Sequence, residues 1–294
     1  MDFDLSERLR ARRAEVPVDT DAYRVLDGTA WRGVFIDSLA GRLLVSLRDA
    51  ELPAALEEQL RACGLPVYLK RLDNDLKLPP RQILGEPQPP RFGVLENGVT
   101  YLLDLSAGYS QGLFLDQRLN RAEVRRRCRR GMRLLNTFAY TGAFSVCAAL
   151  AGAETTTLDL AQPCLNWCRE NMALNGIDPA LHHFCKGDTL HWLERFERQG
   201  RRFDAIILDP PTFSRDAKGR IWRVESDYDR LVARAAACLA PQGWLLCTTN
   251  CRKLSHAAFR NRVAAGIPGA QLSPAPMPPE FDGENYLKGL WAQR

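Results

Sequence analysis

An acid followed by two prolines, Asp209-Pro210-Pro211, stands directly after a short apolar run that is rich in β-branched residues. That run, Phe203 to Leu208, is typical of a buried parallel strand. In open α/β sheets, ligands bind at the carboxyl ends of such strands. Because proline has a fixed φ and no N–H, we expect a rigid loop whose carbonyls stay unpaired. Such a loop could hold a flat base, although an ordinary proline turn after a strand would contain the same residues.

A second strand and turn lie upstream of this loop. Met132 to Thr137 is predicted to be a strand and Ser145 to Ala151 a helix, with the turn Phe138-Ala-Tyr-Thr-Gly-Ala-Phe144 between them. Gly142 would let the backbone approach a ligand closely. A single glycine does not make the Gly-x-Gly-x-x-Gly fingerprint that cradles a pyrophosphate, which argues against a nicotinamide oxidoreductase.

Acidic residues end the predicted strands that follow. The segment Glu154 to Asp159 is rich in threonine and ends in a carboxylate that suits a ribose diol. A third strand, His183 to Cys185, is followed by Gly187-Asp188, and the fourth ends at Asp209. This alternation of strands and helices predicts an α/β fold built on a Rossmann-like, doubly wound parallel sheet.

Several strings in the chain share the pattern of one family, and they extend from about residue 90 to the end. They are Gly112-Leu-Phe-Leu-Asp-Gln-Arg118, Asn136-Thr-Phe-Ala-Tyr-Thr-Gly142, Asn171-Met-Ala-Leu-Asn-Gly176, Asp209-Pro-Pro-Thr-Phe213 and Gly283-Glu-Asn-Tyr-Leu-Lys-Gly289. The chain resembles class I S-adenosylmethionine methyltransferases, and among them the bacterial 23S ribosomal RNA methyltransferases that modify cytosine C5 or guanine N7. The resemblance implies S-adenosyl-L-methionine as cofactor, methyl transfer as activity and RNA as partner.

The resemblance also implies roles for the matching positions. The methionine end of the cofactor would lie against Phe138, Tyr140, Thr141 and Gly142. Asp159 would bind the ribose hydroxyls, and Asp188 with Thr189 would approach the adenine. Asp209 would be catalytic and contact the cofactor, and the target base would face Asp209, Pro210, Pro211 and Phe213. Gln117 and Arg118 would lie near the methionine or the target nucleotide.

The target atom depends on Cys251, which follows a predicted strand. Cytosine C5 is not nucleophilic, so an enzyme must first add a thiolate to C6. Cys251 stands at the position of that nucleophile in the cytosine enzymes, and the cations Arg252 and Lys253 favour a thiolate. Guanine N7 carries a lone pair and needs no thiol, and Asn250 with the basic residues after it also resembles the guanine enzymes. The sequence favours cytosine C5, with guanine N7 as the alternative and an incidental cysteine as a third interpretation.

Arginines are concentrated in one segment. Eight of them lie between Arg118 and Arg133, a stretch that we expect to be helical. Such a stripe fits contacts to RNA phosphates, and we assign these to Arg125, Arg126, Arg129 and Arg130. A second basic stretch contains Arg215, Lys218, Arg220 and Arg223, with Trp222 placed for base stacking. An arginine-rich composition or a solvated helix face would explain the same residues.

The predicted elements in the first part of the chain indicate a separate small domain. We expect an α+β domain over residues 1–87 and the methyltransferase domain over residues 88–294. The N-terminal part is predicted to contain a hairpin (Gly33–Asp37 and Arg42–Ser46), a helix (Pro53–Cys63), a strand (Val67–Leu69) and a proline-rich linker (Pro79–Pro90). The cytosine enzymes carry a similar domain preceded by an RNA-binding PUA domain, for which we expect no room here.

The composition indicates a globular protein of 294 residues, 46% hydrophobic, with a net charge of +5. We expect no transmembrane run and no signal peptide. Nine scattered cysteines indicate reduced thiols in a cytoplasmic protein, and no standard zinc spacing occurs, so we expect no metal. The sequence leaves open a monomer or a homodimer. It also leaves open a noncatalytic RNA-binding module, although Gly142 is too small to fill a cofactor pocket.

Overall fold

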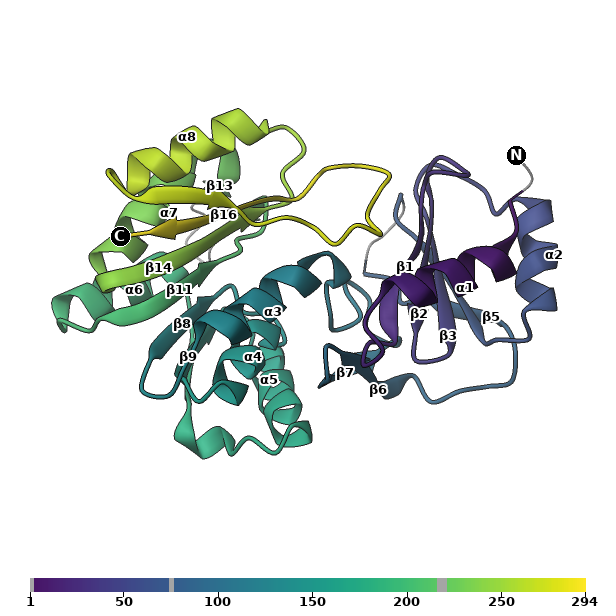
Figure 1. The fold of residues 1–294 in the computed structure, drawn as a ribbon, viewed down its shortest axis with the longest axis horizontal. Coiled ribbons are helices and arrows are strands. Elements are labelled where there is room, and N and C mark those ends of the chain that lie inside the picture. The colour runs from purple at the N-terminus through teal and green to yellow at the C-terminus, as the bar shows by residue number, and fades with distance from the viewer. Residues whose placement is uncertain (1–2, 74–76, 216–220) are drawn as a thin grey trace. The chain divides into compact units, whose positions relative to one another are not determined.

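The chain divides into two compact units in the computed structural model, which describes residues 3–73, 77–215 and 221–294. One unit contains Met1–Arg118 and Pro278–Asn285, and the other contains Leu119–Met277 and Tyr286–Arg294 (Figure 1). The domain limits expected at residues 87 and 88 stay a prediction. The segment 278–285 therefore packs with the N-terminal unit although it lies near the end of the chain.

The N-terminal unit is built on a five-stranded sheet in the order β1-β2-β3-β4-β5. Its strands are β1 (Ala22–Asp27), β2 (Val34–Leu39), β3 (Arg42–Leu47), β4 (Val67–Arg71) and β5 (Arg81–Leu84), with helices α1 (Leu5–Glu15) and α2 (Ala54–Ala62). Strands β2 and β3 are antiparallel, as the predicted hairpin requires. The expected linker at Pro79–Pro90 was wrong in part, because β5 lies within it and pairs with β4.

The same unit contains a hairpin of β6 (Arg91–Glu96) and β7 (Val99–Asp104) and the short helix η1 (Leu115–Gln117). Ion pairs and a hydrogen bond attach the segment 278–285 to it. The guanidinium of Arg118 lies 2.6 Å from the carboxylate of Glu280, and both side chains are buried. Arg12 bonds Asp282, and the N–H of Gly283 donates to Asp27 at 3.0 Å.

The second unit is a seven-stranded sheet in the order β10-β9-β8-β11-β14-β16-β15. Its strands are β8 (Arg133–Thr137), β9 (Glu154–Asp159), β10 (His183–Lys186), β11 (Phe203–Leu208), β14 (Leu239–Thr249), β15 (Gln271–Pro274) and β16 (Lys288–Gln293). The first five strands in this order are parallel, and β16 is antiparallel to both of its neighbours. The predicted Rossmann-like α/β fold is confirmed, and β16 makes its sheet mixed.

Helices cover both faces of this sheet (Figure 1). They are α3 (Arg118–Arg127), α4 (Ala143–Leu150), α5 (Gln162–Leu174), α6 (Thr189–Arg198), α7 (Val224–Ala237) and α8 (His256–Gly266). Along β11, Ile206 and Leu208 pack in one apolar cluster with residues of α6, α7 and α8, while Ala205 and Ile207 pack in another with residues of α3 and α4. This alternation explains why the strand is apolar throughout, since both of its faces are buried.

The arginine-rich helix is shorter than expected. Helix α3 ends at Arg127, and β8 already begins at Arg133. Between them the N–H of Met132 donates to the carbonyl of Arg129 at 3.1 Å, in a turn that contains Gly131 with a positive φ of 88°. Arg129 and Arg130 therefore lie in a turn and not on the helix, which corrects the predicted helical range.

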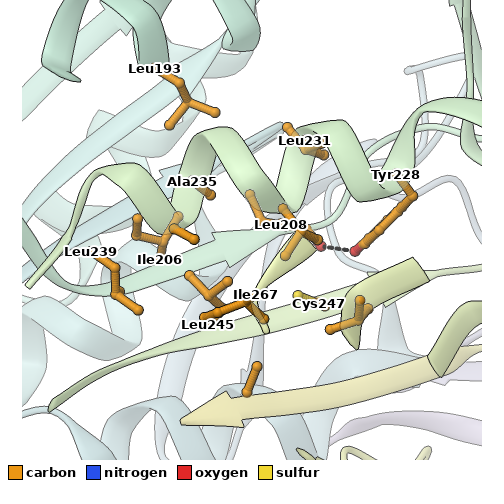
Figure 2. Packing of buried hydrophobic residues seen from close by; sticks show 14 of the residues in the cluster. Leu193, Ile206, Leu208, Tyr228, Leu231, Ala235, Leu239, Leu245, Cys247 and Ile267 are labelled. Carbon is orange, nitrogen blue, oxygen red and sulfur yellow. Dashed lines mark hydrogen bonds between the residues drawn. The ribbon is translucent and has the colours of Figure 1, made fainter. Parts of the chain in front are cut away.

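Tyr228 on α7 lies across the carboxyl ends of two neighbouring strands. Its hydroxyl is 3.0 Å from the carbonyl of Leu208 on β11, the bond drawn in Figure 2, and 3.0 Å from the carbonyl of Thr248 on β14. The ring is fully buried and packs edge-on against Phe259 of α8. Burial raises the pKa of Tyr228 well above its ordinary value, so the hydroxyl stays a donor.

Gly142, the residue before α4, is required by packing. It has a φ of 74°, and a Cβ built on it would lie 2.0 Å from the Sγ of Cys168 on α5. The lack of a side chain therefore lets α5 approach the start of α4. The approach of a ligand to Gly142 stays a prediction.

We expect Gly142→Ala to lower the free energy of unfolding by about 2–4 kcal/mol. About 1–2 kcal/mol comes from the left-handed backbone and a similar amount from overpacking against Cys168. Urea denaturation measures the change. Gly176→Ala is the matched control, because Gly176 has a φ of 69° but no atom near its Cβ position. Equal losses in both variants would show that Cys168 imposes no constraint.

Candidate active site

Loops from four neighbouring parallel strands meet at the carboxyl edge of the second sheet. They follow β8 at Phe138, β9 at Asp159, β11 at Asp209 and β14 at Asn250. The chain order reverses between β8 and β11, so this edge contains the topological switch point where open α/β sheets bind ligands. The topology brings the predicted residues of these loops to one edge.

The turn after β8 has an unusual backbone. Phe138 and Tyr140 have positive φ values of 52° and 49°, which are rare for bulky residues. Backbone bonds hold them: the N–H of Ala139 donates to the carbonyl of Leu158 at 3.1 Å, and the N–H of Gly142 donates to the carbonyl of Ala139 at 2.8 Å. Strained residues that the surrounding structure holds in place cluster at ligand sites, so the turn is a candidate for cofactor binding.

Buried polar side chains hold this turn from below. The hydroxyl of Ser145 on α4 accepts from the amide of Asn136 at 3.0 Å and from the hydroxyl of Thr157 at 2.8 Å. The amide of Asn171 on α5 donates to the carbonyl of Thr141 at 3.0 Å. Because each bond links a different element, the turn is fixed relative to β8, β9, α4 and α5.

Asp159 at the end of β9 already has partners within the chain. Its two carboxylate oxygens accept from the backbone N–H groups of Tyr140 and Ala161, each at 2.8 Å. Burial raises the pKa of Asp159 above its ordinary value, and these N–H donors oppose that rise. A carboxylate has about four acceptor positions, so these bonds leave room for a hydroxyl of a diol. The carboxylate therefore fits a ribose and also fastens the turn.

Asp188 and Thr189 occupy the start of α6. The carboxylate of Asp188 accepts from the N–H of His191 at 2.9 Å and caps the helix. The side chain of Trp192, one turn later, donates to the carbonyl of Lys186 and lies against Gly187. Thr189 is buried. The adenine contact of these residues stays a prediction, and helix capping explains Asp188 by itself.

The loop after β11 is held on both sides. The hydroxyl of Thr248 on β14 donates to the carboxylate of Asp209 at 2.7 Å. The indole N–H of Trp222 donates to the carbonyl of Pro211 at 3.0 Å, and the N–H of Val224 donates to the carbonyl of Thr212 at 3.2 Å. The expectation that these carbonyls are unpaired was therefore wrong, because the strand β13 (Ile221–Arg223) and the start of α7 supply donors.

The aromatic residues of this region differ in exposure. Phe213, in β12 (Phe213–Arg215), is 49% exposed, and the guanidinium of Arg223 lies 5.3 Å from its ring. Trp222 is buried beside Phe138, with 6.5 Å between ring centroids. Trp222 is therefore not free to stack a base, contrary to expectation. Lys218 and Arg220 of the second basic stretch lie outside the described residues.

The turn after β14 contains Asn250 and Cys251. Asn250 is exposed, whereas Cys251 is only 3% exposed and belongs to the apolar cluster around α7 and α8. The carbonyl of Cys251 accepts from the ammonium of Lys288 on β16 at 3.1 Å. Lys288 and Tyr228 are not among the site residues predicted from the sequence. The shared string Gly283–Gly289 contains Lys288, whereas the sequence had no signal for Tyr228.

Gln117 and Arg118 belong to the N-terminal unit and not to the unit of the other predicted residues. Arg118 is buried and paired with Glu280, which gives it a structural role. The cofactor contacts predicted for these two residues stay predictions.

The arginine stripe separates into buried and exposed members. Arg121 is buried near the ring of Phe144, and Arg127 is half-buried, with its guanidinium 4.4 Å from the ring of Trp291. The members assigned to RNA are all exposed: Arg125, Arg126, Arg129 and Arg130. Arg126 pairs with Glu123 at 2.6 Å.

Comparison with known proteins identifies the family to which this chain is similar. Residues 72–292 match the family of S-adenosylmethionine-dependent methyltransferases. YwbD of Bacillus subtilis, a proposed ribosomal RNA large subunit methyltransferase, is 33% identical over 282 residues, which are 90% of this chain and 71% of YwbD. The ribosomal RNA large subunit methyltransferase I of Erwinia tasmaniensis is 33% identical over 258 residues, 83% of this chain and 64% of the relative.

Solved structures share the fold over the whole chain. SMU.776, a proposed methyltransferase crystallised with S-adenosylhomocysteine (SAH), has a TM-score of 0.86 and 26% identity, and the match covers 100% of this chain and 83% of that one. The Asp159 carboxylate, with acceptor positions left over beside a strained turn, fits the ribose end of such a cofactor.

We expect Asp159→Asn to weaken SAH binding by about 1.5–3 kcal/mol, the contribution of a hydrogen bond to a charged group. Calorimetry measures the affinity. Because the pKa of Asp159 is raised, wild-type affinity should fall on acidification at a higher pH than an ordinary aspartate would give, and the variant should lack that fall. Asp178→Asn is the control, since Asp178 also accepts a backbone N–H but on another loop. Equal affinities in the wild type and Asp159→Asn would remove Asp159 from the site.

Proposed function

Because the chain belongs to the S-adenosylmethionine-dependent methyltransferases, we propose that it methylates large-subunit ribosomal RNA at guanine N7. The names of its relatives support the RNA substrate. The chain spans 71% and 64% of the length of these two relatives, so their whole activity is carried over here as a proposal. A ribosomal substrate would place the enzyme in the cytoplasm. No helix in the described ranges is long and apolar enough to cross a membrane.

We choose the target atom on the basis of one observation, the burial of Cys251. A nucleophile must come within about 3–3.5 Å of the carbon that it attacks. Cys251 is 3% exposed and packs among apolar side chains, which is typical of a structural cysteine and not of a reactive one. Guanine N7 has its own lone pair, so its methylation needs no thiol. The burial of Cys251 therefore favours N7 over the cytosine C5 that the sequence favoured.

The cofactor supplies an electrophilic methyl group on a sulfonium, and the chain has to orient the base. Phe213 is exposed and can stack on a base, since aromatic–base stacking is worth about 1–3 kcal/mol. Asn250 carries an amide that can both donate and accept, and Asp209 carries a carboxylate that accepts only. Held by Thr248, Asp209 has a fixed orientation toward a base placed between the loops after β11 and β14.

Cytosine C5 remains the second candidate, and one observation favours it. The ammonium of Lys288 bonds the backbone carbonyl of Cys251, so a buried cation lies next to this residue. A cation favours the thiolate that attack on C6 requires. A noncatalytic RNA-binding module is a third candidate, and it predicts no SAH binding.

We expect RNA containing 5-fluorocytidine to form no covalent adduct with the enzyme, because N7 methylation has no thiol addition to C6. Cys251→Ser should keep methyl transfer to unmodified ribosomal RNA within a few-fold of the wild type. Denaturing gel electrophoresis detects the adduct, and nucleoside mass spectrometry identifies the methylated base. A trapped adduct, or a loss of several powers of ten in rate in Cys251→Ser, would establish the cytosine mechanism instead.

The exposed arginines are proposed to bind RNA phosphates. Replacing Arg125, Arg126, Arg129 and Arg130 with glutamine should flatten the log–log salt dependence of RNA affinity by about 0.7–0.9 for each phosphate that is no longer bound. The matched control replaces four exposed arginines on α6, α7 and α8: Arg198, Arg230, Arg234 and Arg260. Fluorescence anisotropy at several salt concentrations measures both slopes. If both fourfold variants had the same salt-dependence slope, these four arginines would be a solvated surface and would not bind RNA phosphates.

A further inference from the structure

Lys288 is a buried cation that has no carboxylate partner among the described residues. It is 4% exposed, and within the described residues no acid lies at ion-pair distance from it. Its ammonium donates to two backbone carbonyls, that of Cys251 at 3.1 Å and that of Tyr286 at 2.8 Å. Burial lowers the pKa of Lys288, with Arg252 lowering it further and Cys251 opposing the change. Burying a charge that lacks an opposite charge is unfavourable, so a structural role alone explains Lys288 poorly.

The position of Lys288 in the sheet shows what its side chain does. Lys288 is the first residue of β16 and lies opposite Thr249, the last residue of β14. Its side chain extends past this last residue pair and bonds the carbonyl of Cys251. The bond therefore links β16 to the turn that follows β14. Asn250 lies between these two attachment points and is exposed.

Other bonds complete the turn. The N–H of Cys251 donates to the hydroxyl of Thr249 at 3.2 Å, and the N–H of Leu254 donates to the carbonyl of Cys251 at 3.2 Å. These two bonds are local, because their donors and acceptors lie within six residues of the chain. The bond from Lys288, in contrast, joins the carbonyl of Cys251 to another strand of the sheet.

We propose that Lys288 is a positioning residue, which holds the turn at Cys251 so that Asn250 is presented to the acceptor base. This inference rests on the proposed function for the contact between Asn250 and the base. The attachment of the turn itself does not depend on that function and can be measured without RNA.

The test uses Lys288→Met in the full chain, and its first measurement is thiol reactivity. Alkylation of Cys251 by iodoacetamide, followed by peptide mass spectrometry, should be at least about tenfold faster than in the wild type, because loss of a bond from a charged donor eases opening of the turn. Cys247 is an internal control: it lies on β14, is fully buried and should stay protected in both proteins. Unchanged protection of Cys251 in a folded variant would overturn the proposal.

The second measurement is methyl transfer at saturating RNA. We expect kcat to fall by about 10–100-fold, as for a misplaced substrate-orienting group, with SAH affinity unchanged. Lys70→Met is the matched control, because Lys70 is equally buried and also donates to a carbonyl, that of Gly108, but in the N-terminal unit. It should leave kcat unchanged at saturating RNA. A tenfold fall in both variants would overturn a specific role of Lys288.

The two measurements separate this proposal from the proposed function. Faster alkylation of Cys251 with an unchanged kcat would refute the positioning role. If the wild type methylates no RNA, the proposed function fails, while the alkylation rates still test the attachment of the turn. Lys288→Arg is a second variant for the case that Lys288→Met proves unstable. Because arginine keeps the positive charge and the N–H donors, Cys251 should stay protected from alkylation in this variant. Loss of protection in a folded Lys288→Arg protein would also count against the proposal.

Discussion

Strands that end inside a protein leave backbone groups that no neighbouring strand can pair, and these groups need other partners, among them side chains. The carboxyl edge of the second sheet is shaped by this constraint. Tyr228 lies on the carbonyls that end β11 and β14, Asn171 donates to Thr141, and Lys288 donates to Cys251. Each of these side chains comes from an element other than the one whose backbone it bonds. The sheet and its helices therefore hold the loops of the site, in addition to the local bonds within each loop.

The same constraint gives Asp159 two tasks. Its carboxylate accepts the N–H of Tyr140, a residue with a positive φ, and so helps to hold the strained turn that precedes α4. The acceptor positions that remain suit the ribose of the cofactor. Removing this carboxylate would release backbone donors as well as the proposed ligand contact, so a truncation to alanine would mix a folding effect with a binding effect. Asparagine separates them better, because it keeps the shape and one acceptor.

The sequence predicted much of the second unit because its strands are short runs rich in apolar or β-branched residues, each followed by an acid or a turn. The run Phe203–Leu208 and the Thr-rich segment before Asp159 became strands as expected. Predictions failed where a tertiary partner decided the outcome. Nothing near Pro211 indicated that Trp222 would donate to its carbonyl, and no periodicity separates the buried Arg121 from the exposed Arg125. Tyr228 was missed because a tyrosine on an amphipathic helix is usually part of the core.

The choice between the two target atoms follows from accessibility and not from residue type. By sequence, Cys251 stands where the cytosine enzymes have their nucleophile, but it is only 3% exposed in the structure. Lys288 bonds the carbonyl of Cys251 in the turn after β14. Under the proposed role of Lys288, the same bond would present Asn250 to a base and keep the thiol away from it. A mechanism through Cys251 would require the ammonium to release the Cys251 carbonyl before attack, at the loss of a charge-assisted bond. Direct attack by a base lone pair needs no such opening, and it uses the turn in the conformation in which the fold holds it.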